Sequence, residues 1–117
     1  MIILHIVGGK EWREQENAAF YTHPSLSEVG FLHCAKIPDV VDAANCYYRG
    51  TSGLLLLCID TQKVKPEIKW ETSPYGVEFP HLCGRLNKDA IVAVLDFPID
   101  NDGWFIFPEQ LRQYAGQ

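Results

Sequence analysis

The stretch LLLLCID, residues 54–60, constrains the fold of this chain most strongly. Every residue in it is apolar except the final aspartate, and a glycine turn comes directly before it. A short apolar run of this length, bounded by a turn, is typical of a strand buried within a sheet. We therefore expect residues 54–60 to form a central strand.

The rest of the pattern predicts further strands and a few helices. Strands are expected at residues 1–7, 31–34, 68–72, 79–84, 90–97 and 104–107. Helices are expected at residues 10–20, 25–28 and 40–49, and from Pro108 onwards. Ser25 and Glu28 match a capping box, and Gly30 and Gly50 are natural helix stops. Pro80 lacks an N–H, so we expect residues 79–84 to avoid the centre of a sheet. About six strands and three helices in irregular order predict an α+β fold, in a single domain over residues 1–117.

Composition narrows the kinds of partner that this domain is expected to bind. The 117 residues are 47% hydrophobic, enough for a core that needs neither a disulfide nor a metal. The formal net charge is −5 and no basic run occurs, which argues against nucleic acid and anionic membranes as partners. No apolar segment approaches the roughly 20 residues of a membrane span, and the N-terminus lacks a signal-peptide pattern. We therefore expect a cytoplasmic protein.

Three of the four histidines lie in apolar, strand-like segments. They are His5 in ILHIV, His33 in FLHCA and His81 in FPHLC. An imidazole buried in such a segment needs hydrogen-bond partners for its ring nitrogens. For one histidine alone, a hydrogen-bonded core position is the ordinary explanation. Because three occur in so short a chain, we predict that they converge on one cleft and form a pocket of polarisable groups.

The cysteines show no spacing typical of a metal site or a disulfide framework. None forms a CxxC pair, and each has apolar neighbours; they are Cys34, Cys46, Cys58 and Cys83. His33 and Cys34 are adjacent, so on a strand their side chains would face opposite sides rather than one metal. The spacing of His81 and Cys83 matches no common zinc site. We predict free thiols, no bound metal and no structurally bound cofactor.

Three further side chains are candidates for the cleft. Glu71, which follows Trp70 in a strand, would be its only obvious anion, and a carboxylate beside a histidine can steady a developing positive charge. Tyr21 and Ser25 flank the loop before the short helix, and such loops often line pockets. The alternatives are a solvated Glu71 and a Ser25 that serves only as a helix cap. No nucleophile elbow, phosphate-binding glycine loop or dinucleotide fingerprint is present.

The order of these motifs resembles the bacterial family called domain of unknown function 952. The most specific part is the pair GFLHC and FPHLCG, residues 30–34 and 79–84. Supporting matches cover nearly the whole chain, at His5, Trp12, Tyr21, Ser25, Leu26, Asp60, Trp70 and Glu71. The chain departs from the family pattern at Cys83, where tyrosine is expected, and at Ala35, where serine is expected. The missing tyrosine hydroxyl would leave the pocket with one hydrogen bond fewer.

That family looks like a compact relative of the ADP-ribosyltransferase fold, a small split sheet of mixed or antiparallel strands with an NAD cleft between its halves. The segment ending at His33 is similar to the one before the central histidine of RNA 2′-phosphotransferases of that fold. The resemblance implies that NAD or an ADP-ribosylated compound is the substrate, that His33 is catalytic, and that the third catalytic element is Glu71, with His81 as its rival. It implies that His5 anchors the dinucleotide, and we expect Tyr21 and Ser25 to bind the cofactor beside it.

Three interpretations remain open from the sequence. The first is an enzyme that transfers ADP-ribose from NAD or acts on an ADP-ribosylated substrate. The second is a non-catalytic module that binds a nucleotide or another small ligand, because a fold does not guarantee chemistry. The third is a protein-interaction domain that uses exposed aromatic residues. The acidic charge argues against tRNA as the substrate.

Overall fold

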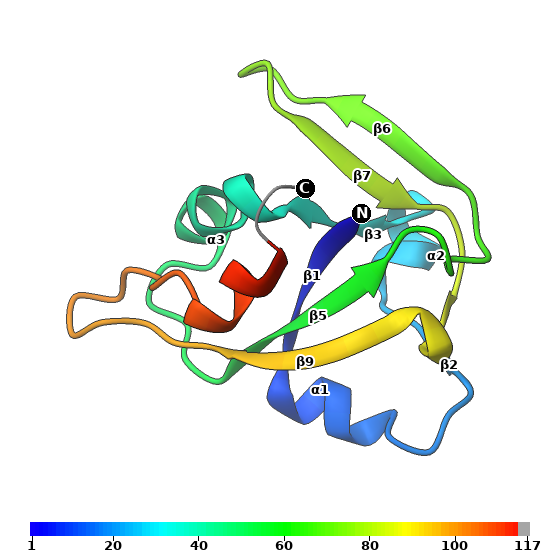
Figure 1. The fold of residues 1–117 in the computed structure, drawn as a ribbon, viewed down its shortest axis with the longest axis horizontal. Coiled ribbons are helices and arrows are strands. Elements are labelled where there is room, and N and C mark those ends of the chain that lie inside the picture. Colours follow the sequence, from blue (N-terminus) through cyan, green and yellow to red (C-terminus); the bar gives the residue numbers. More distant parts are fainter. Residues whose placement is uncertain (115–117) are drawn as a thin grey trace.

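A four-stranded antiparallel sheet forms the centre of the fold (Figure 1). The computed structural model describes residues 1–114 of the chain. The strand order is β4-β1-β5-β9, with bounds Ala35–Lys36, Ile2–Gly8, Leu54–Asp60 and Ile91–Phe97. The apolar run at 54–60 is therefore a central strand, as predicted.

At β1 and β5 both faces of this sheet are buried, which explains why these two strands are apolar at nearly every position. On one face the strands pack against helix α3, Val40–Tyr47, and a C-terminal 3₁₀ segment, Glu109–Tyr114. On the other face they pack against the short strands that follow helices α1, Gly9–Glu14, and α2, Ser25–Val29. Side chains alternate between these cores, so Leu56 lies in the first and Leu57 in the second.

A smaller three-stranded sheet lies beside the central one. Its order is β3-β7-β6, with bounds Leu32–His33, Glu78–Leu82 and Ile68–Thr72. Strands β3 and β4 are consecutive in the chain but belong to different sheets, because the chain bends at Cys34. The single strand predicted at 31–34 is therefore interrupted. In Figure 1 the β6–β7 hairpin projects away from the central sheet.

Pro80 lies in β7, the central strand of the smaller sheet, and the prediction that it would avoid such a position was wrong. Its carbonyl accepts the N–H of Cys34, so its missing N–H would face the same neighbouring strand. At that point the chain leaves β7 and pairs with β1 instead. The proline is tolerated because the ladder ends beside it.

Two further α-helices, two very short strands and two 3₁₀ segments complete the description of residues 1–114. The bounds are Gly9–Glu14 for α1, Ser25–Val29 for α2, Phe20–Tyr21 for β2, Leu86–Asn87 for β8, and Ile37–Asp39 and Lys88–Ala90 for the 3₁₀ segments. The helix predicted at 10–20 ends early because Gln15 bonds both backbone groups of Thr22, and β2 pairs with β8. Two-residue strands carry no periodic signal, so both were missed. No helix in the described part is long and apolar enough to cross a membrane.

The capping box and the strand at residues 104–107 were predicted wrongly, the helix stop at Gly30 is confirmed, and the C-terminal helix is present in another form. The capping box at Ser25 does not form, because Ser25 lies inside the first turn of α2 and its hydroxyl bonds His23. Residues 104–107 form no strand, and a single bridge joins Ile99 to Phe105. Gly30 ends α2 with a φ of 87°, a left-handed conformation that favours glycine. The predicted C-terminal helix after Pro108 is 3₁₀ as far as the described residues reach.

Candidate functional site

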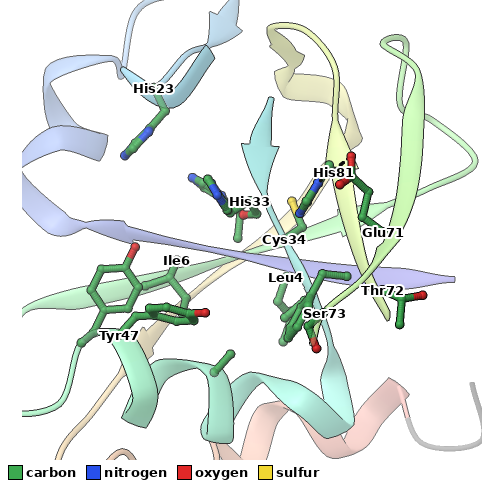
Figure 2. Close-up of a pocket in the computed structure, with 15 residues that line it drawn as sticks. Leu4, Ile6, His23, His33, Cys34, Tyr47, Glu71, Thr72, Ser73 and His81 are labelled. Atoms are coloured by element: carbon green, nitrogen blue, oxygen red, sulfur yellow. Dashed lines mark hydrogen bonds and ion pairs between the residues drawn. The ribbon is translucent and has the colours of Figure 1, made fainter. Parts of the chain in front are cut away.

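A pocket of about 520 Å³ lies where β1, β3, the end of α3 and the β6–β7 hairpin meet (Figure 2). This volume is within the range of small-molecule sites. The lining consists of Leu4, His5, Ile6, His23, His33, Cys34, Ala35, Ala43, Tyr47, Tyr48, Glu71, Thr72, Ser73, Phe79 and His81. All four histidines of the chain belong to it, so the predicted convergence of three of them is confirmed.

The pocket exists because β4 covers only part of one edge of β1. Strand β4 pairs with β1 at Ile3 and Leu4, whereas β5 pairs with β1 along its whole length. The positions that would continue the β4 ladder alongside β1 are Cys34 and His33. They turn away to meet β7 instead, where His33 pairs with His81. The edge of β1 beyond Leu4 is thereby left open to form one wall of the pocket.

His5 is buried and hydrogen bonded at both ring nitrogens. Its Nδ1 lies 2.6 Å from the carbonyl oxygen of His33, and its Nε2 lies 2.8 Å from the Tyr21 hydroxyl. A carbonyl only accepts, so Nδ1 carries the proton and Nε2 accepts the Tyr21 O–H. Burial lowers the pKa of His5 to about 4, although the bond to His33 opposes the shift. At pH 7 His5 is therefore a neutral imidazole with no ring nitrogen left for a ligand.

Tyr21 and Ser25, predicted to contact the ligand, lie behind the pocket wall. Tyr21 is fully buried and donates to His5, and burial raises the pKa of its hydroxyl well above the usual value. Ser25 is buried at the start of α2, with its hydroxyl 2.9 Å from Nδ1 of His23. Neither residue lines the pocket. Tyr21 hydrogen bonds to His5 and Ser25 hydrogen bonds to His23, and these bonds orient the two imidazoles. The position of the two residues beside a loop does not reveal this role.

Lowering the pH from 7 to 5 is expected to destabilise the protein by about 2 kcal/mol through His5 alone. The pKa of His5 is about 4 in the folded state and about 6.5 in the unfolded chain, so between these values the unfolded state binds more protons. The stabilisation is complete above pH 6.5 and is lost as the pH falls towards 4. Urea unfolding at both pH values measures the difference.

The matched control for this pH dependence is His5→Asn. Asparagine retains a side-chain donor for the His33 carbonyl but does not titrate in this range. The variant is expected to lose less stability than the parent protein on acidification. An equal loss in both proteins would assign the effect to other groups and contradict the role of His5.

His33 and His81 face each other on the pocket side of the smaller sheet. They are directly paired between β3 and β7, and their ring centroids are 5.5 Å apart. Phe31 stacks on His81 with centroids 3.9 Å apart and planes only 6° from parallel, which holds the ring in place. Burial and, second, the neighbouring His81 lower the pKa of His33. The two hydrophobic motifs of the sequence therefore meet at their histidines.

Glu71 places a carboxylate beside this histidine pair. Lys69 on β6 pairs directly with His81 on β7. Glu71 lies two residues further along β6, so it is a diagonal neighbour of His81. Its Oε1 lies 3.5 Å from Nδ1 of His81, and within residues 1–114 that buried nitrogen has no hydrogen-bond partner. This separation is too long for a strong hydrogen bond but allows electrostatic attraction. The Glu71 side chain is 55% exposed, so a ligand in the pocket can reach its carboxylate.

Cys34 also lines the pocket, contrary to the predicted alternation of residues 33 and 34. The bend between β3 and β4 turns both side chains to the same space. Burial raises the pKa of the Cys34 thiol well above its usual range, so it is not an activated nucleophile. Cys83 lies outside the lining, with its sulfur 3.8 Å from the His81 carbonyl, so the departure from the family pattern there lies off the pocket wall. The four cysteines are free thiols.

Several residues of the pocket lining were not predicted from the sequence. Those with aromatic or polar side chains are His23, Tyr47, Tyr48, Thr72, Ser73 and Phe79. Tyr47 is 76% exposed although it lines the pocket, so it forms part of the rim. Two features of the sequence could have indicated some of these residues. Tyr47 and Tyr48 are adjacent and come just before the predicted helix stop at Gly50, and His23 lies two residues before the start of a helix.

Among residues 1–114, those that line the pocket include one anionic side chain and no lysine or arginine. That anion is Glu71, while the lowered pKa values of His5 and His33 favour their neutral forms at pH 7. Tyr47, Tyr48 and Phe79 add aromatic surface. Such a pocket favours a neutral or cationic ring over a phosphate group. Within residues 1–114, no cluster of three potential metal ligands is formed.

The fold and the pocket together define a small α+β protein with several antiparallel sheets and a ligand-sized cavity lined by histidines. The family described as "Protein of unknown function (DUF952)" matches residues 6–94, a span that includes both histidine motifs. The chain belongs to this family. No curated protein matches it.

Solved structures of one bacterial protein have a similar fold. A crystal structure of CC0527 from Caulobacter crescentus is 24% identical, covers 100% of both chains and superposes with a TM-score of 0.81. A crystal structure of a double mutant of CC0527 gives the same values. The solution NMR structure of CC0527 is 26% identical, with a TM-score of 0.74 over 98% of this chain and 97% of that one. These similarities show the fold.

Proposed function

We propose that this protein is an ADP-ribosyltransferase-like enzyme that acts on NAD, or on an ADP-ribosylated substrate, in the histidine-lined pocket. The observation that carries the proposal is the Glu71 carboxylate, 3.5 Å from His81 and on the same wall as His33. These side chains come from the three strands of one small sheet, a more rigid support than a loop.

Cleavage of the bond between nicotinamide and ribose needs stabilisation of positive charge rather than a proton donor. As the C1′–N bond breaks, its electron pair passes to the ring nitrogen, and nicotinamide leaves as a neutral molecule. The ribose gains oxocarbenium character, which a carboxylate close to its hydroxyl groups stabilises. Glu71 is suited to this role. With water as acceptor, the products are nicotinamide, ADP-ribose and a proton.

The two histidines are suited to position the donor and to take up the proton of the acceptor. A lowered pKa leaves His33 with a free lone pair at pH 7, and a neutral imidazole accepts a proton from attacking water or from a hydroxyl group. The stacked Phe31 holds His81 between His33 and Glu71. The arrangement therefore combines a base with a charge-stabilising group.

The charge of the lining indicates which half of NAD enters the pocket. A diphosphate would find no lysine or arginine there, and it would be repelled by Glu71. The nicotinamide ring is cationic and flat, so it suits the carboxylate and the aromatic side chains of Tyr47, Tyr48 and Phe79. In this proposal the nicotinamide riboside end lies inside and the phosphates remain at the mouth.

A non-catalytic module that binds a small ligand is the second candidate function. It is favoured by the Cys34 thiol, which lies in the lining but is kept in its neutral form, so it offers the pocket no activated nucleophile. Such a module would bind NAD or a related compound through the same residues and leave it intact.

Incubation of the purified protein with NAD is expected to release nicotinamide, measured by proton NMR against a sample without protein. Side-chain resonances of His33 and His81 are expected to shift during the titration. Binding without release would favour the second candidate. If millimolar NAD and ADP-ribose neither bind nor react, the proposal is wrong and the aromatic rim becomes a candidate protein-interaction surface.

A further inference from the structure

We infer that His23, rather than His5, is the imidazole that binds the substrate near the exposed edge of β1, by donating a hydrogen bond from Nε2 to a substrate oxygen. The inference rests on the proposed function and adds a binding residue to that site. The inference follows from which ring nitrogens of His5 and His23 already hydrogen bond within the protein.

The local hydrogen bonds of His23 fix the position of its proton. The backbone N–H of Ser25 donates to Nδ1 of His23 over 3.1 Å. A ring nitrogen that accepts this bond carries no proton, so the proton of the neutral ring is on Nε2. The Ser25 hydroxyl, 2.9 Å from the same Nδ1, is therefore a second donor to it.

The ring of His23 is aimed so that this N–H faces the pocket. His23 lines the cavity, and its ring lies 5.8 Å from that of His5 in an edge-on arrangement. Figure 2 shows the His23 ring pointing away from its own ribbon, towards the side where His33 and Tyr47 lie. Because Nδ1 is held from behind by Ser25, Nε2 is the nitrogen that a ligand meets.

His5 cannot replace His23 in this role. Its Nδ1 donates to the His33 carbonyl and its Nε2 accepts from Tyr21, so both nitrogens are used inside the protein. Any new bond to a ligand would break one of these buried contacts. His5 therefore supports the pocket wall through its buried hydrogen bonds, and His23 offers its Nε2–H to the substrate.

The accepting atom is expected to be an uncharged oxygen of the substrate. A single N–H without a nearby lysine or arginine is a weak anchor for a phosphate, and Glu71 adds repulsion. A ribose hydroxyl or the carboxamide oxygen of nicotinamide satisfies the donor without that penalty. We therefore assign His23 to the nicotinamide riboside half of NAD.

The position of the proton is tested without a ligand by long-range proton–nitrogen NMR of the histidine rings at pH 7. The expected result is a protonated Nε2 in His23 and a protonated Nδ1 in His5. A protonated Nδ1 in His23 would overturn the inference, because that nitrogen could no longer accept the Ser25 N–H.

Two variants at this position separate binding from local structure. His23→Asn keeps a side-chain acceptor for the Ser25 N–H, but its shorter amide places no donor at the position of Nε2, so it is expected to weaken binding of NAD and of nicotinamide riboside about tenfold. His23→Gln places an amide N–H near the position of Nε2 and is expected to bind within about threefold of the parent. Unchanged denaturation midpoints for both variants exclude a loss of folding as the cause.

The outcomes distinguish this inference from the proposed function. If the parent protein binds NAD and His23→Asn binds it equally well, the inference alone fails. A loss seen with NAD but not with nicotinamide riboside would place the contact outside the nicotinamide riboside half of NAD and overturn the assignment. If the parent protein binds neither compound, the proposed function fails and the inference fails with it.

Discussion

Replacing His5 with alanine is expected to lower the free energy of unfolding by about 3 kcal/mol. The imidazole is buried, so its removal leaves a cavity in the second core beside β1. It also leaves the Tyr21 hydroxyl and the His33 carbonyl without the partners they have in the folded protein. The cost combines the lost packing with two unpaired polar groups. Urea unfolding at pH 7 measures it.

His33→Ala is the control variant, because it removes an imidazole from the same pocket without breaking the hydrogen bonds of His5. His33 is exposed on the pocket face, and the bond to His5 uses its backbone carbonyl, which alanine retains. Its loss is expected to change the free energy of unfolding by less than about 1 kcal/mol. Equal destabilisation by both substitutions would show that His33 is also a structural residue. An unaltered midpoint for His5→Ala would show that its hydrogen bonds add nothing to stability.

Glu71→Gln is expected to reduce the rate of nicotinamide release from NAD by about 100-fold to 1000-fold. Glutamine has the same shape and retains hydrogen-bonding atoms, so the substitution removes chiefly the negative charge. That charge is what the proposed chemistry needs as the ribose becomes cationic. Stability is expected to stay nearly constant, since Glu71 is half exposed and its contact with His81 is long. The rate is measured under single-turnover conditions.

Glu78→Gln is a matched control on the same hairpin. Glu78 is an exposed glutamate at the start of β7 and does not line the pocket. The substitution removes the same charge from a residue outside the pocket lining, and release of nicotinamide is expected at the parent rate. Full activity of Glu71→Gln would refute the role of the carboxylate. A similar fall in the rate of nicotinamide release in both variants would show that the overall charge of the protein, and not the Glu71 carboxylate, causes the effect.

Elements with a strong local signal were predicted with accurate bounds. The strands at 54–60 and 68–72 have those limits in the structure, and α3 begins at Val40 as expected. Each is defined within a short window, by an apolar run or by a turn or helix-start residue beside it. Strands β2 and β8 were missed because each consists of two residues that are extended only through pairing with the other.

Only the part of the site that has a local sequence signal was predicted. The repeated motif of a histidine within an apolar segment indicated that His33 and His81 were unusual, and the structure pairs them directly. It could not indicate that Tyr21 and Ser25 hydrogen bond to His5 and His23 behind the wall rather than line the pocket. Nor did it single out His23, whose segment is not apolar.

The sequence by itself determined the α+β class, the central strand and the histidine-bearing segments, because alternation, apolar runs and glycine stops are local properties of a chain. Tertiary structure decided where the pocket lies and what each histidine does there. The bend at Cys34 divides one expected strand between two sheets and opens the edge of β1. Whether an imidazole is buried and doubly bonded, as in His5, or held from one side, as in His23, depends on partners distant in space or on the path of a loop. No spacing along the chain encodes that difference, since it arises only when the segments pack.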